Sequence, residues 1–210
     1  MKSCRVLLIA LFSFLYVSLN SQVFVGGSFR FNTSNHKTDD TPTDKTSNYS
    51  LYLTPSAGKF LSEKFAIGIE LDLSLSRNKT DFLTETISKS SSFGGSPFLR
   101  FYAIKWNKLS LYGQGNIGLE FSRSRINSGG TTINGPKSTT TYVNIYPGIS
   151  YDISDKLSLQ TSLNILSLGY NYSITKGDSS KTTASSFNIG AGLGNIISFN
   201  AITIGGIYKF

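Results

Sequence analysis

FAIGIELDLSLS, residues Phe65–Ser76, is the stretch that decides the fold, because it alternates along its whole length. Large apolar side chains occupy every second position: Phe65, Ile67, Ile69, Leu71, Leu73 and Leu75. The positions between them hold only Ala, Gly, Ser, Glu or Asp. Successive side chains of a β-strand point to opposite faces, so a period of two predicts a strand with one apolar and one polar face.

The same pattern recurs along the chain. Leu109–Ser122 repeats it almost as cleanly, with Leu, Gly, Ile and Phe on one face. Six weaker copies bring the total to eight predicted strands: Val23–Asn32, Tyr49–Phe60, Pro97–Ile104, Tyr142–Ile153, Leu157–Tyr172 and Ala201–Phe210. The alternation slips at Ile165 and Leu166, which predicts a β-bulge there.

The connections between these strands are alternately short and long. The short ones are Leu61–Lys64, Lys105–Lys108 and Ile153–Lys156; each ends in Lys, and we expect one hairpin motif used three times. The long ones are polar and are predicted to be surface loops: Ser34–Ser47, Asn78–Ser91, Arg123–Thr139 and Thr175–Ser185. Tight turns at one end and long loops at the other predict an up-and-down antiparallel meander.

Composition excludes several functional classes. The 210 residues suffice for one domain, and the single Cys and single His provide neither a zinc cluster nor a disulfide framework. No cofactor is expected. The net charge of +8 does not indicate nucleic-acid binding, because the lysines are scattered without interleaved aromatic residues.

The first 21 residues have the pattern of a secretory signal peptide. Lys2 and Arg5 precede an apolar run, Val6–Val17, which small and polar residues follow up to Ser21. The run is shorter than the roughly 20 residues of a spanning helix, which disfavours a membrane anchor. Cleavage near Ser21 would leave residues 22–210 as one β-barrel domain that lacks the only cysteine, Cys4.

Alternation alone does not say which face of the sheet points inward. The two clean strands are long enough for one membrane crossing, which needs 9 to 11 residues, and their polar face would make a poor apolar ligand pocket of the lipocalin kind. We therefore predict a transmembrane barrel with a polar lumen. Five charged residues are predicted to form a network in it, with Glu70 and Arg100 at similar depth on neighbouring strands: Arg30, Glu70, Asp72, Arg100 and Glu120.

The last eight residues, TIGGIYKF, place Thr203, Gly205, Tyr208 and Phe210 in a spacing that resembles the C-terminal insertion signal of bacterial outer-membrane barrels. Three further segments look like recurring pieces of such barrels: Pro97–Tyr102, Tyr146–Tyr151 and Leu168–Tyr170. From Gln22 to Phe210 the chain resembles the small outer-membrane β-barrels of Gram-negative bacteria, the OmpA-like and OmpX-type, porin-family group.

The resemblance implies an all-β, eight-stranded antiparallel up-and-down transmembrane β-barrel in the outer membrane, inserted by the barrel assembly machinery and monomeric in its lipid surroundings. Phe187–Phe199 departs from the pattern. It would extend the barrel above the membrane, which we favour, fold into the lumen, or add a hairpin to give ten strands. Trp106, Tyr208 and Phe210 are expected in an aromatic girdle at the periplasmic interface.

These features predict a non-enzymatic protein with a structural or surface-interaction role, such as envelope integrity, adhesion or recognition, and a lumen plugged by side chains. A narrow pore for small solutes is the first alternative. A surface lipid-modifying enzyme, using His36 with Asp39 and Asp40, is the second. Lipopolysaccharide is the expected anionic partner, close to four cations of the long connections: Lys37, Lys79, Lys137 and Lys176.

Overall fold

The computed structural model describes residues 22–37, 45–82, 84–163, 166–177, 180–191 and 203–210, and every regular element in these ranges is a β-strand. No helix within them is long and apolar enough to cross a membrane. The strands are β1 (Val23–Lys37), β2 (Lys45–Phe60), β3 (Phe65–Phe82), β4 (Thr84–Trp106), β5 (Leu109–Ser128), β6 (Thr131–Asp152), β7 (Leu157–Ser162), β8 (Leu166–Lys176), β9 (Lys181–Ala191) and β10 (Thr203–Lys209).

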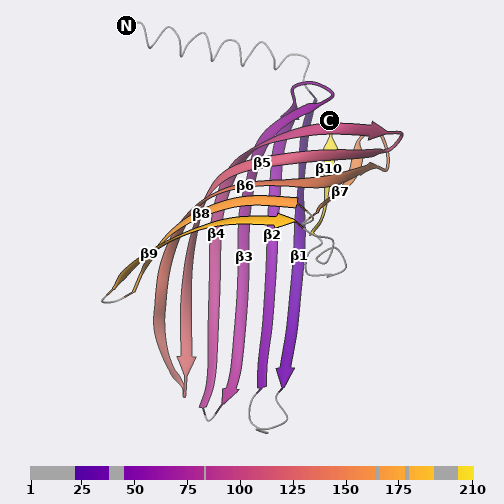
Figure 1. The fold of residues 1–210 in the computed structure, drawn as a ribbon. Helices are drawn as coiled ribbons and strands as arrows, with labels where there is room; N and C mark the ends of the chain where they lie inside the picture. Colours follow the sequence, from indigo (N-terminus) through magenta and orange to yellow (C-terminus); the bar gives the residue numbers. More distant parts are fainter. Residues whose placement is uncertain (1–21, 38–44, 83, 164–165, 178–179, 192–202) are drawn as a thin grey trace, which may run out of the picture.

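The sheet closes on itself into a barrel. Antiparallel pairing runs in the order β5-β4-β3-β2-β1-β10-β7-β6, and β6 pairs with β5 to complete a ring of eight strands. β1 meets β10 in a register that begins with Phe24 opposite Lys209 and ends with Phe29 opposite Ile204. Figure 1 shows β1 beginning and β10 ending at the same end of the barrel. The predicted eight-stranded, up-and-down antiparallel fold is confirmed.

The ten segments form a barrel of eight strands because each of the last two barrel strands, or staves, is interrupted. β7 and β8 belong to the seventh stave, and β9 and β10 to the eighth. β7 and β8 both pair with β6, and β9 pairs with β8. The step from Ser162 to Leu168 on one side lies opposite the shorter step from Gly148 to Ile145 on the other. Extra residues are therefore present near the predicted bulge, although residues 164 and 165 lie outside the described ranges.

Strand β9 contains the first part of the segment that departs from the pattern. Phe187–Ala191 belongs to β9 and pairs with Leu166–Tyr170 of β8, within the apolar part of the wall and not above it, so the favoured prediction is wrong for these residues. The rest of that segment lies outside the described residues. Among the described residues, β9 has no pairing with β1, whose ladder with β10 ends at Phe29.

The long connections are largely strand, not loop, which corrects the prediction. The ladder of β3 and β4 continues to Phe82 opposite Thr84, and β5 and β6 pair up to Ser128 opposite Thr131. Once a register is fixed in the barrel wall, each further rung satisfies more backbone groups, and Thr suits extended backbone. The β5–β6 hairpin turns at Gly129 and Gly130, whose φ of +58° and +84° glycine adopts without strain.

The opposite end of the barrel, here called the tight-turn end, carries the short connections. Ser62 Oγ accepts the backbone N–H of Phe65 at 3.2 Å, and Ser154 Oγ accepts that of Leu157 at 3.1 Å. Two of the three turns therefore share one motif. The third differs: β4 passes to β5 through Asn107, which has a φ of +52°, so the expected threefold reuse is wrong.

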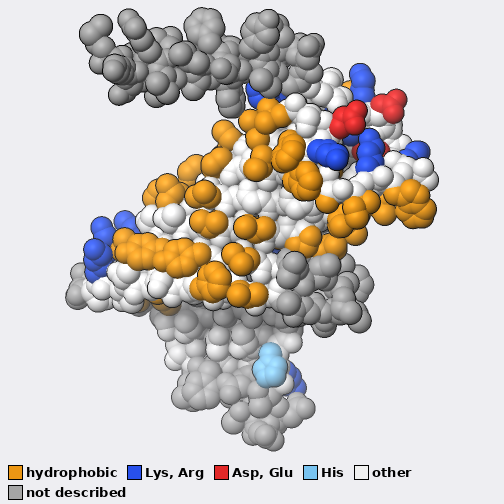
Figure 2. All heavy atoms as spheres, turned by 45° about the horizontal axis from the view of Figure 1, so that its top comes forward, with side chains coloured by type: hydrophobic (Ala, Val, Ile, Leu, Met, Phe, Trp, Pro, Cys, Tyr) orange, Lys and Arg blue, Asp and Glu red, His pale blue; other side chains and the backbone are white. Residues whose placement is uncertain are grey.

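The apolar side chains point outward, as predicted for a membrane barrel. On β3, Ile69 and Leu75 are 59% and 60% exposed, whereas Glu70 is 8% exposed. Figure 2 shows hydrophobic side chains spread as a broad band over the barrel wall. Trp106, Tyr208 and Phe210 are exposed at the tight-turn end of their strands, where the girdle was expected.

A small apolar cluster fills the lumen near the tight-turn end. Its buried members are Phe24, Ala66, Phe98 and Ile207, with Phe60 and Tyr102 packed against them. The rings of Phe24 and Phe98 lie 6.3 Å apart. Glycines make room for them, because a Cβ at Gly68 would lie 2.6 Å from Cζ of Phe98 and a Cβ at Gly58 would lie 2.6 Å from Cζ of Phe24.

Closure between β1 and β10 predicts a specific cross-link. Opposed residues of an antiparallel pair lie about 4.5–5.5 Å apart between Cα atoms, within reach of a disulfide. In a Cys4→Ser background, the pair Phe29→Cys and Ile204→Cys should oxidise and change mobility on a non-reducing gel. Val25→Cys with Ile204→Cys, offset by four residues in the same register, is the control and should not cross-link. Equal cross-linking of both pairs would contradict the register.

Candidate functional site

The candidate site is a polar cavity in the lumen, on the side of the apolar cluster away from the tight turns. Its volume is about 520 Å³. Residues from all eight strands of the barrel line it, because each strand presents alternate residues inward, and β10 contributes Gly205. Among them are Arg30, Tyr52, Glu70, Asp72, Arg100, Gln114, Asn116, Glu120, Tyr142, Asn144, Tyr146, Gln160 and Asn171.

Arg100 forms the floor of this cavity and is 4% exposed. Its Nε and Nη2 donate to Oε1 of Gln114 at 2.9 and 2.6 Å. Nη1 donates to Oε1 of Gln160 at 2.8 Å, and the guanidinium carbon lies 4.5 Å from the ring centre of Tyr112. Arg100 on β4 therefore ties β5 and β7 together across the lumen.

Gln114 connects this arginine to an acidic residue. Its Nε2 donates to Oε1 of Glu70 at 3.0 Å and to the hydroxyl of Tyr146 at 2.7 Å, and Asn116 Nδ2 donates to Oε2 of Glu70 at 3.2 Å. Both carboxylate oxygens of Glu70 thus accept hydrogen bonds. Buried charge is tolerated when such partners surround it.

The prediction that Glu70 and Arg100 lie at similar depth on neighbouring strands is wrong. In the β3–β4 register Arg100 lies opposite Ala66, and Glu70 lies opposite Ser96, four positions farther along β3. The two side chains meet through Gln114 rather than directly. Counting from the turns fails because the two strands are staggered: Phe65, the first residue of β3, lies opposite Phe101, whereas β4 continues to Trp106.

The other predicted lumen residues line the upper cavity. Asp72 accepts a hydrogen bond from the hydroxyl of Tyr142, and Glu120 lies in the same wall. The guanidinium of Arg30 lies over the ring of Tyr52, 4.4 Å from its centre. The structure places all five predicted charged residues in one cavity, and within the described part of the chain a single shared hydrogen-bond partner, Gln114, joins Glu70 to Arg100.

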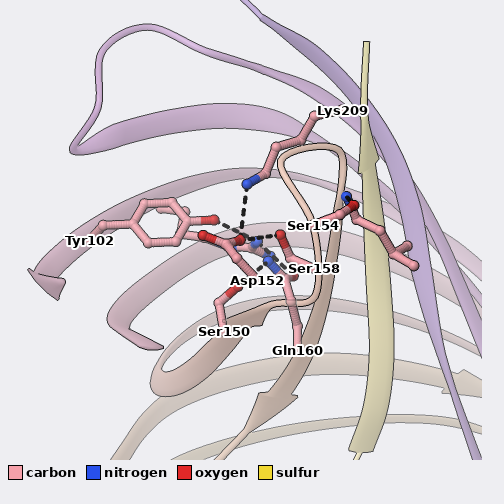
Figure 3. A network of polar contacts seen from close by, with 9 residues as sticks. Tyr102, Ser150, Asp152, Ser154, Ser158, Gln160 and Lys209 are labelled. Carbon is pink, nitrogen blue, oxygen red and sulfur yellow. Dashed lines mark hydrogen bonds and ion pairs between the residues drawn. The ribbon is translucent and has the colours of Figure 1, made fainter. Parts of the chain in front are cut away.

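A second polar group joins three neighbouring strands, β6, β7 and β10, near the tight turns (Figure 3). Lys209 Nζ, at the end of β10, lies 3.0 Å from Oδ1 of Asp152 at the end of β6, and Ser158 of β7 also donates to that carboxylate. Two residues along β7 from Ser158, Gln160 accepts from Arg100 and donates to Ser150 Oγ at 3.4 Å. The neighbouring strands β6, β7 and β10 are therefore joined by side chains as well as by backbone hydrogen bonds.

Sequence reasoning missed several polar residues of this site, among them Tyr142, Tyr146 and Gln160. Each occupies an inward position on β6 or β7, where the apolar alternation is weaker than on β3 and β5. Their signal was available in principle, because side chains with polar groups occupy every second position over Tyr142–Tyr146 and over Ser158–Ser162. It could not reveal which of them reach Arg100 or Glu70.

The described residues hold no cluster of three or more His, Cys, Asp or Glu side chains fit to bind a metal ion. His36 is exposed on β1 opposite Thr46, and its suggested partners Asp39 and Asp40 lie outside the described residues. The insertion-signal residues lie on or next to β10, where Gly205 pairs with Ser28 and the rings of Tyr208 and Phe210 are 5.2 Å apart. The side chain of Thr203 is outside the description.

A closed sheet with apolar side chains outside and a polar, hydrogen-bonded interior is the arrangement of a transmembrane β-barrel. The chain is a small β-barrel of the outer-membrane type, the class expected from the sequence.

Comparison with known proteins adds no closer identity. No family model and no curated protein matches the chain. Solved structures similar to it include the Neisserial surface protein NspA (17% identity, 90% of this chain, 96% of that one, TM-score 0.38). A major outer membrane protein of Thermus thermophilus has 10% sequence identity and a TM-score of 0.48, over 91% of this chain and 100% of that one. The attachment invasion locus protein Ail of Yersinia pestis has 15% identity and a TM-score of 0.35, over 90% of this chain and 97% of that one.

The Arg100 network predicts a large stability effect. Arg100→Ala removes the N–H groups that donate to Oε1 of Gln114 and to Oε1 of Gln160. Those buried oxygens then lose the hydrogen bonds that Arg100 provides. We expect the free energy of unfolding to fall by about 3–5 kcal/mol, measured by denaturant titration of the barrel in lipid vesicles. Lys64→Ala, in an exposed turn, is the control and should change it by less than about 0.5 kcal/mol. A loss below about 1 kcal/mol for Arg100→Ala would show that the network contributes little.

Proposed function

We propose that the chain is a non-conducting integral outer-membrane barrel whose role is structural or one of surface interaction. The observation that carries the proposal is the filled lumen: an apolar cluster around Phe24 and Phe98 and, above it, the hydrogen-bonded layer around Arg100. Eight strands leave an interior just wide enough for side chains to fill. The polar cavity is therefore a closed-bottomed cup rather than a channel.

The location follows from the polarity of the wall. The outward apolar side chains of β3 occupy alternate positions over an 11-residue length of strand, from Phe65 to Leu75. This length fits one tilted crossing of a bilayer. A closed barrel satisfies its backbone groups within the sheet, which a bilayer demands. Together with the predicted signal peptide, residues 1–21, and the predicted insertion signal, this supports export and insertion into the outer membrane by the assembly machinery.

The extended end of the barrel, opposite the tight turns, supports the surface role. β3 to β6 continue as paired ribbons rich in Ser, Thr and Lys well beyond the apolar face, and we place these ribbons outside the cell. Paired ribbons hold side chains in fixed positions, which suits contact with other surfaces better than free loops do. Adhesion, recognition and envelope integrity are all compatible with this arrangement.

A narrow pore for small solutes is the second candidate, since the cavity is polar and contains both signs of charge. It requires that the Arg100 layer and the apolar cluster both move aside. The two layers are stacked along the lumen, so a single rotamer change does not open a path.

Conductance separates these two functions. The purified, refolded protein in a planar lipid bilayer should give no stable single-channel current above background, and Arg100→Ala should also stay near background because the Phe24–Phe98 cluster remains below it. A large-diameter porin in the same bilayer serves as the positive control. A stable, ion-dependent current from the unmutated protein would contradict the non-conducting role and would support transport.

Location and fold have an independent test. The processed protein should be found in the outer-membrane fraction and should migrate differently on a detergent gel with and without boiling, because a hydrogen-bonded barrel resists cold detergent. A protein that is soluble in the periplasm, with no heat-dependent shift, would contradict the membrane assignment.

A further inference from the structure

The outer wall carries a row of cations that runs across six neighbouring strands. Seven exposed, outward-facing residues on six strands form it, and we call them the cationic belt: Arg77, Lys89, Arg123, Arg125, Lys137, Lys176 and Lys181. All of them except Arg77 fall in connections that the sequence predicted to be loops, whereas the structure places all seven on paired strands. Their positions are therefore fixed by the ladder.

The register sets these cations directly against each other. Arg77 is the partner of Lys89, and Lys89 is the partner of Arg125. Arg123 is the partner of Lys137, which also faces Lys176 across the next strand pair, and Lys176 faces Lys181. Like charges directly opposite on one face of a sheet are destabilising. Five such pairs in continuous order call for an anionic partner.

The described part of the chain does not provide that partner. No ion pair joins a belt residue to any described carboxylate. The nearest outward acids along β3 and β4, Asp81 and Glu85, lie beyond the belt and pair instead with Lys79 at 3.4 and 2.9 Å. One internal contact is Arg123 Nε with Ser91 Oγ at 3.3 Å, which is neutral.

The belt lies where the apolar face ends. On β3 the last apolar outward residue is Leu75 and the next outward position is Arg77; on β5 Phe121 is followed by Arg123 in the same way. On β8, Ile174 precedes Lys176. This is the level of the lipid headgroups when the apolar face occupies the bilayer. Figure 2 shows one group of basic side chains directly beside the hydrophobic band.

Two outer grooves combine both chemistries. One is lined by Phe93, Phe121 and Ile174 together with three belt residues, Arg123, Lys137 and Lys176. The other is lined by Phe31, Tyr49, Leu51 and Leu75 together with four, Arg77, Lys89, Arg123 and Arg125. Each groove therefore suits a molecule that has an apolar chain and an anionic head.

We propose that the cationic belt binds the phosphate groups of phosphorylated lipid in the outer leaflet, with the acyl chains lying in the grooves beneath. Arg and Lys form charge-assisted hydrogen bonds to phosphate oxygens, and a phosphate between two opposed cations removes their repulsion. The proposal rests on the membrane placement proposed above and assigns the lipid contact to named strand residues.

The test counts lipids bound to the folded barrel by native mass spectrometry from detergent micelles. The probes are bisphosphorylated lipid A, the same lipid without its phosphates, and phosphatidylethanolamine. We expect retention of bisphosphorylated lipid A only. The triple variant Arg123→Gln, Lys137→Gln, Lys176→Gln should weaken that binding by about tenfold.

The matched control removes three lysines from the tight turns: Lys64→Gln, Lys108→Gln, Lys156→Gln. These residues are also exposed, so the net charge changes equally while the belt stays intact. Lipid A binding by the control should equal that of the unmutated protein. Equal binding by both triple variants, or equal retention of the dephosphorylated lipid, would overturn the proposal.

The heat-dependent gel shift is measured on every variant first, so that loss of the barrel is distinguished from loss of the lipid site. If the unmutated protein shows the gel shift but no selective binding of lipid A, the proposed lipid-binding role of the cationic belt is contradicted, while the membrane placement stands. The absence of a shift in the unmutated protein contradicts the membrane placement itself. Lys137→Arg keeps the charge at its position and should therefore retain the binding of the unmutated chain.

Discussion

The closure of the sheet between β1 and β10 is the constraint on which the rest of the structure depends. In a bilayer no water is present to satisfy an open strand edge, so a sheet can cross only when its first and last strands pair. The register from Phe24–Lys209 to Phe29–Ile204 provides that pairing. On the other side of β10, the ion pair of Lys209 with Asp152 ties this closing strand to β6.

Closure fixes what the interior must contain. A ring of eight strands encloses a space that side chains fill, and alternate residues of every strand point into it. Here the filling is layered: an apolar cluster near the tight turns, then Arg100 with its glutamines, then Glu70, and finally the open polar cup. These stacked layers hold the staves together and block a straight path along the lumen.

Closure also fixes the outer face, where the same alternation gives a sharp boundary. Apolar residues face lipid up to Leu75 and Phe121, and cations replace them at the next outward positions. Since the strands are hydrogen-bonded beyond this boundary, the cations keep their level in the wall. One ladder thus sets the depth of the barrel in the membrane and the height of the charged belt.

The alternation of Phe65–Ser76 and of its copies along the chain determined the strands and divided their side chains between two faces, because a period of two assigns every side chain to a face. Strand length and the polarity of one face then indicated that this face, with its five charged residues, lines the lumen. Sequence did not determine which polar side chains meet. The Gln114 bridge between Arg100 and Glu70, the row of opposed cations and the extension of expected loops into ribbons all depend on the register between strands. Register arises from pairing across the closed ring, where turn shape and bulges shift one strand against another, and no single stretch of sequence contains that information.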